Sequence, residues 1–249
     1  MKIKTVFGIL LVVLLLAACK VTPNTAATQN SNSEPLTSEL KPEPTESVLS
    51  EDLILREEFD DDINKNWGIK IVSGLEDQLI WSQTNGKFRL EIQPPNDTNF
   101  AFFRKDTSYD DVIVQAEVEN YGQTDNAFSL MCRASEQGWY ELRISSQGYY
   151  ELLRYDQYLA DEGKNAYTNF VEKRIGSTLI KTGEDTNVFA LSCQGDQLKV
   201  FINGEQVYAD KRPLTVEDTT YSEGTVGFGV LSYGKEVDVT FNYLETLKP

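Results

Sequence analysis

The chain has 249 residues, a formal net charge of −16 and no histidine. A charge of this size and sign repels nucleic acid and anionic lipid headgroups, so we expect no nucleic-acid partner. The lack of histidine excludes Ser-His-Asp and Cys-His catalytic groups and imidazole zinc sites, which leaves carboxylates as the main acid and base candidates.

Residues 1–18 are arranged like a bacterial signal peptide. A short basic start is followed by an apolar run over residues 6–16, which is shorter than the ~20 residues that a membrane-spanning helix needs. The segment Leu16-Ala17-Ala18-Cys19 resembles the bacterial lipobox. This resemblance implies cleavage before Cys19 and acyl chains on Cys19 that anchor an extracytoplasmic protein to the bacterial membrane or cell surface. The alternative is an ordinary secretory signal followed by a free thiol.

Residues 19–50 are predicted to be a disordered linker. They are rich in Thr, Ser, Asn, Glu and Pro, as in Lys41-Pro42-Glu43-Pro44, and contain few apolar side chains. Such a segment buries too little apolar surface to offset the entropy lost on ordering. Its prolines favour extended conformations, which would hold a folded domain over residues 51–249 away from the lipid surface.

The part from residue 51 onward reads as β-structure. Apolar and polar residues alternate with period two in segments separated by turn signals, for example over 87–92, 112–118, 140–144 and 198–202. The pair Asn203-Gly204 suits a type I′ hairpin turn. Many short strands within one domain predict an all-β fold, a two-sheet antiparallel jelly-roll sandwich.

Cys132 and Cys193 are predicted to form a disulfide. An isolated cysteine pair in an exported protein usually does so. By strand alternation Cys132 shares a face with Phe128 and Leu130, and Cys193 shares one with Leu191, so both thiols would point into the core. The bridge would close a loop of roughly 60 residues.

Several segments together resemble the concanavalin A-like lectin/glucanase superfamily, nearest to its 3-keto-disaccharide hydrolase-like and laminin-G-like groups. In chain order they are FDDD at 59–62 with Trp67, FSLMCR at 128–133, WYELRI at 139–144, GYYEL at 148–152, NVFALSCQG at 187–195, LKVFING at 198–204, GTVGF at 224–228 and VTFN at 239–242. The resemblance implies two curved antiparallel sheets, with ligands taken on the concave face or at its rim loops.

Alternation also predicts a candidate ligand face. If Cys132, Tyr140 and Leu142 face the core, the charged and aromatic residues between them face outward. Charged groups flanked by aromatic rings suit sugars, because rings stack on sugar faces and Arg and Glu hydrogen-bond to hydroxyls. The alternative is a solvated face with cross-strand Arg-Glu pairs. The candidate residues are Arg133, Trp139, Glu141, Arg143, Tyr150 and Arg154.

Two further features carry carboxylates. Glu117 and Glu119 fall on one face of their predicted strand, roughly 6.5–7 Å apart, and paired carboxylates are what glycoside hydrolysis needs. They lack the Glu-x-Asp-x-x-Glu spacing of the laminarinase-type glucanases, so they can equally be surface charge. Asp60, Asp61 and Asp62 enter a loop and could bind calcium, or serve as turn formers.

The sequence therefore favours a lipid-anchored jelly-roll module that binds glycan or another envelope component without catalysis. One alternative is a carbohydrate-active hydrolase that uses carboxylates of the same face. The other is a structural or protein-interaction module. These functions share a fold, so the residues of the site must distinguish them.

Overall fold

The structure, a computed structural model, describes residues 52–93, 97–171, 174–209 and 211–249. The expected signal peptide, Cys19 and the linker over 19–50 lie outside these residues. Helices are short: α1 spans Ile63–Asn66, the 3-10 helix η1 spans Glu76–Gln78, and α2 spans Gln157–Asp161. No helix in the described ranges combines the length and apolarity needed to cross a membrane.

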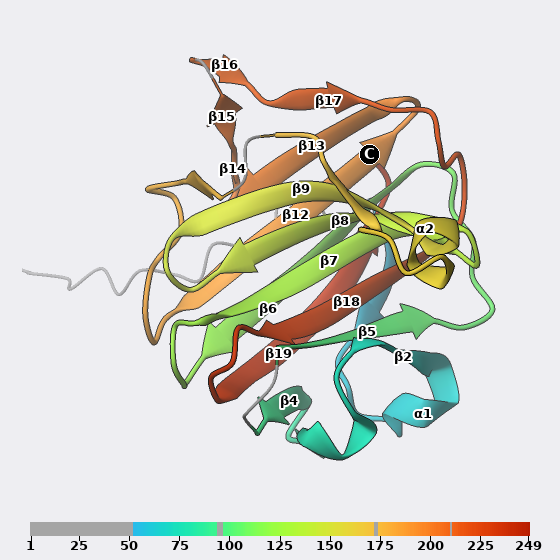
Figure 1. Cartoon of the computed structure of the whole chain (residues 1–249). Coiled ribbons are helices and arrows are strands. Elements are labelled where there is room, and N and C mark those ends of the chain that lie inside the picture. Colours follow the sequence, from blue (N-terminus) through green and yellow to red (C-terminus); the bar gives the residue numbers. More distant parts are fainter. Residues whose placement is uncertain (1–51, 94–96, 172–173, 210) are drawn as a thin grey trace, which may run out of the picture. The chain divides into compact units, whose positions relative to one another are not determined.

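Two antiparallel sheets build the fold (Figure 1). The nine-stranded sheet contains β1 (Leu53–Glu57), β3 (Leu79–Thr84), β4 (Lys87–Ile92), β6 (Val112–Asn120), β12 (Thr186–Gln194), β13 (Gln197–Ile202), β14 (Glu205–Gln206), β17 (Thr215–Glu217) and β19 (Val237–Leu247). The eight-stranded sheet contains β2 (Trp67–Ser73), β5 (Thr98–Arg104), β7 (Asn126–Ser135), β8 (Gly138–Ser145), β9 (Tyr149–Asp156), β10 (Tyr167–Asn169), β11 (Ile175–Gly176) and β18 (Thr225–Ser232). A separate pair joins β15 (Tyr208–Ala209) to β16 (Arg212–Pro213).

Strands that are distant in sequence lie side by side in both sheets. The main orders are β14-β13-β12-β6-β19-β4-β3 and β10-β9-β8-β7-β18-β5-β2. The C-terminal strand β19 thus pairs with β6 and β4, while β18 lies between β7 and β5. The predicted all-β, two-sheet antiparallel jelly-roll sandwich is confirmed.

The core between the sheets follows from strand alternation. On β6 the side chains of Val112, Val114, Ala116 and Val118 are buried, and the residues between them are only half-buried. At the centre of the core, the Phe228 ring packs against five other aromatic rings, those of Phe59, Trp67, Phe88, Phe102 and Phe241. Burying a Phe side chain stabilises the fold by about 1.5–3 kcal/mol, so this cluster holds the two sheets together.

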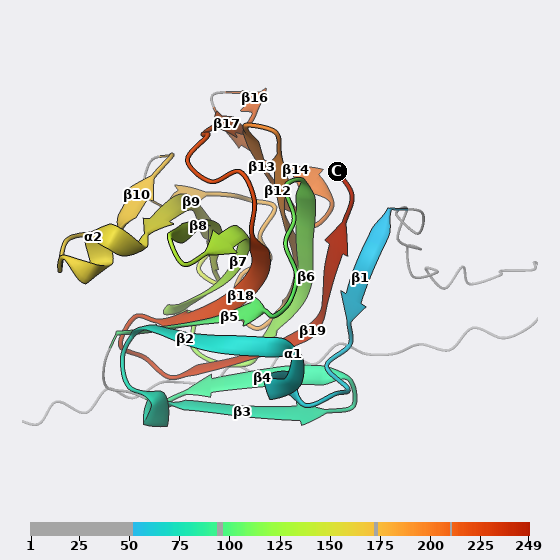
Figure 2. The same ribbon diagram turned by 90° about the vertical axis from the view of Figure 1, so that its right-hand side faces the viewer.

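A second apolar cluster lies on the other face of the eight-stranded sheet. It contains Met131 and Trp139 from the sheet and is covered by residues 157–169, called here the α2–β10 segment, through Leu159 and Ala166. Figure 2 shows α2 and β10 on the side of β8 and β9 that faces away from β6 and β12. The middle of this sheet is therefore buried on both faces, which explains why nearly every residue of β7 is buried.

The predicted disulfide between Cys132 and Cys193 is confirmed, with 6.6 Å between the two Cα atoms. Cys132 lies on β7 and Cys193 on β12, and both side chains are buried in the core. The bridge therefore connects the eight-stranded sheet to the nine-stranded sheet.

Replacing both cysteines by alanine is expected to lower the free energy of unfolding by about 4 kcal/mol, because the unfolded chain then regains the entropy of an open loop of roughly 60 residues. Urea unfolding followed by tryptophan fluorescence measures this change. Reducing the disulfide of the native protein should lower its urea midpoint to about that of the double variant, and the same treatment should leave the midpoint of the double variant unchanged. An unchanged midpoint after reduction would contradict the bridge.

Candidate functional site

A polar pocket lies on the outer face of the eight-stranded sheet, under the α2–β10 segment. Its volume is about 510 Å³. The walls come from β2, β5, β8, β9 and β18, from the turn after β18, and from the α2–β10 segment itself. We call it the Arg143 pocket, after the buried cation among its lining residues.

Arg143 is held by a buried carboxylate on its own strand. Its Nε and Nη2 atoms donate to Glu141 Oε1 at 3.0 and 2.9 Å, and Trp139 Nε1 donates to Glu141 Oε2 at 3.0 Å. Glu151, from the neighbouring strand β9, lies 3.9 Å from Arg143 Nη1. Glu141 is fully buried, so its charge depends on these partners for compensation.

Tyr167 links the α2–β10 segment to this pair. Its ring lies 4.7 Å from the Arg143 guanidinium, and its hydroxyl accepts a hydrogen bond of 2.9 Å from Asn99 Nδ2 on β5. Burial raises the pKa of Tyr167 well above its ordinary value, with the Glu141 charge acting in the same direction. The hydroxyl therefore stays protonated and neutral over the physiological pH range.

Three lining residues carry buried polar atoms without a hydrogen-bond partner in the described part of the chain. They are Thr98 Oγ1, Asn99 Oδ1 and the Tyr233 hydroxyl. Buried polar atoms of native proteins are nearly always bonded to protein, water or ligand, and an unbonded one costs about 1–3 kcal/mol. Thr98 shares the core parity of Phe100 and Phe102, so its side chain does not point to the outer face. The unpartnered atoms of Asn99 and Tyr233 beside one pocket therefore favour a site for a hydroxyl-rich ligand.

Trp139 and Glu141 lie on the predicted face but are not exposed on it. Trp139 is only 1% exposed, because its ring stacks on Tyr155 at 3.8 Å between ring centroids and packs against Phe103. The α2–β10 segment covers both residues, which alternation alone does not reveal. Trp139 thus supports the pocket floor and does not offer a ring to a ligand.

The prediction that Tyr150 and Arg154 extend this face is wrong. The β8–β9 register pairs Tyr150 with Ile144 and Arg154 with Tyr140, so both residues share the core parity. Tyr150 is 1% exposed in the core. Arg154 reaches the edge of the sandwich, where its Nη1 atom donates to Asp218 Oδ2 at 2.8 Å.

Arg133 also lies away from the pocket. A bulge at the end of β7 shifts the register between Cys132 and Ser135, and Arg133 itself has a positive φ of 51°. Its buried guanidinium donates to the carbonyls of Asp110 and Tyr221 at 2.8 and 3.1 Å. Arg133 therefore ties loops together at the end of the sandwich and does not line the pocket.

Glu117 and Glu119 lie on the opposite outer face from Arg143, because β6 belongs to the nine-stranded sheet. The prediction that one face carries both sets is thus wrong, since the core separates them. Glu117 accepts a hydrogen bond of 2.8 Å from Asn242 Nδ2, and Glu119 lies 3.7 Å from Lys87 Nζ. Both carboxylates therefore contact polar side chains from other strands of the same sheet.

The three aspartates proposed for calcium lie exposed around the start of α1. Asp62 Oδ1 accepts from the backbone of Asn64 at 3.0 Å and caps the helix, while Asp61 pairs with Lys65 at 3.2 Å. Asp60 lines a hollow beside β19. In the described ranges no three Asp, Glu or Cys side chains are grouped so as to hold a metal ion. Calcium binding stays a prediction from the sequence.

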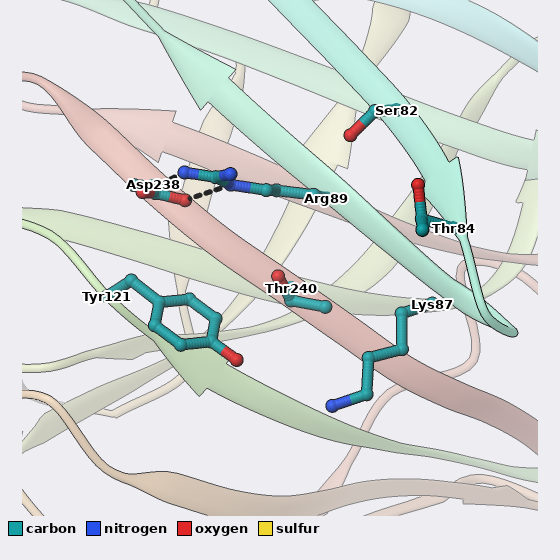
Figure 3. Close-up of a pocket in the computed structure, with 7 residues that line it drawn as sticks. All are labelled: Ser82, Thr84, Lys87, Arg89, Tyr121, Asp238 and Thr240. Atoms are coloured by element: carbon teal, nitrogen blue, oxygen red, sulfur yellow. Dashed lines mark hydrogen bonds and ion pairs between the residues drawn. The ribbon is translucent and has the colours of Figure 1, made fainter.

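The outer face of the nine-stranded sheet has a hollow of its own, of about 410 Å³ (Figure 3). Figure 3 shows the Tyr121 ring at one side, Arg89 bound to Asp238 at another, and Thr240 between them. We call it the Tyr121 hollow. Its aromatic wall is accessible to solvent, since Tyr121 is 45% exposed.

Alternation within β8 predicts Arg143 correctly, and the tyrosine-containing stretch that includes Tyr167 was a candidate rim of the site, but Glu151, Asn99 and Tyr233 were not expected from the sequence. Glu151 and Asn99 lie on β9 and β5, whose registers with β8 and β18 decide what they face. Tyr167 and Tyr233 belong to the α2–β10 segment and to the turn after β18. Asn99 alternates with the buried Phe100 and Phe102, and its resulting outward parity is the one local signal that could have indicated it.

No family model matches the chain, and no curated protein matches it in sequence. Solved structures do match. A Bacillus licheniformis β-glucanase gives a TM-score of 0.54 at 11% identity, over 78% of this chain and 98% of that one. A β-1,3-1,4-glucanase (lichenase) from a mouse hindgut metagenome gives 0.54 at 12%, over 78% and 98%.

A Bacillus subtilis protein of unknown function with a galectin-like fold gives 0.54 at 12% identity, over 79% of this chain and 96% of that one. Identities this low show the fold alone. The chain has the concanavalin A-like jelly roll of these proteins. Its narrower likeness to the 3-keto-disaccharide hydrolase-like and laminin-G-like groups stays a prediction.

Replacing Glu141 by Gln is expected to destabilise the fold by about 3 kcal/mol, because Arg143 is left buried without its main counter-charge. The double variant with Arg143→Met should recover part of this loss. Urea unfolding of both single variants and the double variant measures the coupling free energy.

Glu91→Gln is the matched control, since Glu91 pairs with Arg89 on an exposed face. Its cost should stay below about 1 kcal/mol. Strictly additive effects of Glu141→Gln and Arg143→Met would contradict the coupled pair.

Proposed function

We propose that the protein is an extracytoplasmic, lipid-anchored module whose jelly-roll domain binds a glycan, without catalysis, in the Arg143 pocket. The observation that carries the proposal is the pair of buried polar atoms of Asn99 and Tyr233 that have no hydrogen-bond partner among the described residues and lie beside one pocket. A sugar carries several hydroxyl groups that both donate and accept, so it can complement the Asn99 carbonyl oxygen and the Tyr233 hydroxyl.

The mixed character of the pocket supports a sugar over a purely apolar ligand. The rings of Tyr155 and Tyr167 and the side chain of Val72 line it together with Asn99 and Arg143. Sugar sites combine apolar surface, against which ring C–H groups pack, with a few fixed polar groups. The pocket volume of about 510 Å³ lies within the range of small-ligand sites.

The state of the carboxylates supports binding over catalysis. A glycosidase needs two carboxyl groups that flank the scissile bond and can exchange protons. Glu141 has both oxygens engaged by Arg143 and Trp139. The central strand β7 turns Ala127, Ser129 and Met131 toward this face, and none of them is acidic.

A hydrolase is the second candidate, because Glu141 and Glu151 come from neighbouring strands and both approach Arg143. Two carboxylates beside one pocket are the minimum that the chemistry requires. Formation of shorter glycans by the native protein, and its loss in Glu151→Gln, would favour this candidate over binding alone.

The anchor part of the proposal rests on the N-terminal sequence. A lipid on Cys19 and a proline-containing linker over 19–50 would hold the domain at a distance from the membrane, where extracellular glycans are accessible. Globomycin treatment of producing cells, or mass spectrometry of the mature N-terminus, tests this part independently of ligand binding.

A glycan-array screen of the purified chain should detect at least one ligand, and Tyr233→Phe should weaken its binding about tenfold, since one hydrogen bond made only with the ligand is lost. The Tyr233 hydroxyl has no hydrogen-bond partner among the described residues, so the variant should keep the native unfolding midpoint.

Tyr208→Phe is the matched control, because Tyr208 is exposed on β15 and lies outside the pocket. It should bind like the native protein. Equal binding by Tyr233→Phe and the native protein, or no ligand on the array, would reject the Arg143 pocket as the binding site.

A further inference from the structure

The register of the nine-stranded sheet builds the Tyr121 hollow around a small residue. One lateral row runs from Glu119 on β6 through Thr240 on β19 and Arg89 on β4 to Ser82 on β3. The short Thr240 stands between long neighbours and is 4% exposed, so it forms the floor. The hollow is therefore a product of strand pairing, which makes its floor rigid.

Tyr121 supplies a fixed aromatic wall. Its backbone N–H donates to the Asp238 carbonyl at 2.9 Å, directly after β6 ends. A hydrogen bond to the Glu119 carboxylate and partial burial raise the pKa of Tyr121 to about 12, so the ring stays neutral. A tethered, exposed and neutral ring is suited to stacking on the apolar face of a sugar.

A second hollow, called here the Asn242 hollow, adjoins the first through Lys87, which lines both. Its volume is about 520 Å³, and it contains another tyrosine, Tyr243, with the Arg56 guanidinium 4.1 Å from the ring centroid. Asn242 lines this hollow, and its Oδ1 atom is buried without a hydrogen-bond partner among the described residues. An unpartnered acceptor again points to a ligand that donates hydrogen bonds.

The cations of this surface are already paired with carboxylates. Arg89 donates to both Asp238 oxygens at 2.8 and 2.6 Å, and Lys87 lies 3.7 Å from Glu119. Arg56 pairs with Glu58 and Glu245. Little positive charge is left for an anionic ligand, and the net charge of the whole chain, −16, opposes one further.

We propose that the Tyr121 hollow and the adjoining Asn242 hollow together bind successive units of an uncharged polysaccharide chain. Two adjoining hollows, each with a tyrosine, suit a ligand built from repeating units. The surface lies on the opposite outer face from the Arg143 pocket, so the inference is independent of the function proposed for that pocket. One domain would then contact glycan on both faces, which strengthens attachment through effective concentration.

The test is retention of the full-length chain on beads that carry dextran, mannan or β-glucan, with polygalacturonate beads as the anionic comparison. All proteins carry Tyr233→Phe, so that the Arg143 pocket contributes little. The parent should be retained by at least one neutral polysaccharide, and Tyr121→Ala should weaken retention about tenfold because the stacking ring is lost.

Tyr121→Phe keeps the ring and should be retained like the parent. Tyr208→Ala, which removes an exposed ring elsewhere, should also be retained like the parent. Unfolding midpoints of all variants exclude a folding defect. Short oligosaccharides should compete more strongly as their length increases, while a monosaccharide should compete poorly.

Three outcomes would overturn the proposal: no retention on any neutral polysaccharide, equal retention of Tyr121→Ala, or stronger retention on polygalacturonate. The two proposals fail separately. Loss of bead retention in Tyr121→Ala, with equal array binding by Tyr233→Phe and the native protein, would leave this surface standing without the Arg143 pocket. Weaker array binding by Tyr233→Phe, with equal bead retention of Tyr121→Ala, would leave the pocket standing without this surface.

Discussion

The buried pair of Glu141 and Arg143 constrains the whole outer face of the eight-stranded sheet. A carboxylate with no exposure is tolerated only when its charge is compensated, and here three N–H groups from Arg143 and Trp139 provide that compensation. Arg143 is thereby fixed, and the Tyr167 ring packs over it. The pair thus helps to hold the α2–β10 segment on the sheet and so defines the roof of the pocket.

This roof changes what the sheet can do. In a two-layer sandwich one face of each sheet is normally solvated. Here the α2–β10 segment forms a third layer that covers Met131, Trp139 and Tyr155, and a pocket remains where this cover is incomplete. On the nine-stranded sheet, the described residues that line the hollow over Thr240 come from β3, β4 and β19 and from Tyr121, and its charged groups are paired.

Period-two alternation was enough to predict the β-sandwich, the Cys132–Cys193 bridge and the facing of Arg143, because each depends on a residue's neighbours in its own strand. Alternation failed where the pairing between strands decides which way a side chain faces. The β8–β9 register places the Tyr150 side chain in the core, and a bulge in β7 turns the Arg133 side chain away from the predicted face. Glu117 and Arg143 belong to different sheets, which no local pattern reveals. The burial of Trp139 depends on residues 157–169, whose docking is a long-range contact.

The distribution of satisfied and unsatisfied polar groups argues for binding over chemistry. Charged groups on both outer faces are largely consumed by partners within the protein, as with Glu141 by Arg143 and Asp238 by Arg89. A catalytic carboxyl group must instead be able to gain and lose a proton in contact with its substrate. At the two proposed sites, the described residues leave neutral atoms without a hydrogen-bond partner: Asn99 Oδ1, Asn242 Oδ1 and the Tyr233 hydroxyl. Neutral donors and acceptors recognise hydroxyl groups without polarising a bond, which is the chemistry of a lectin-like site.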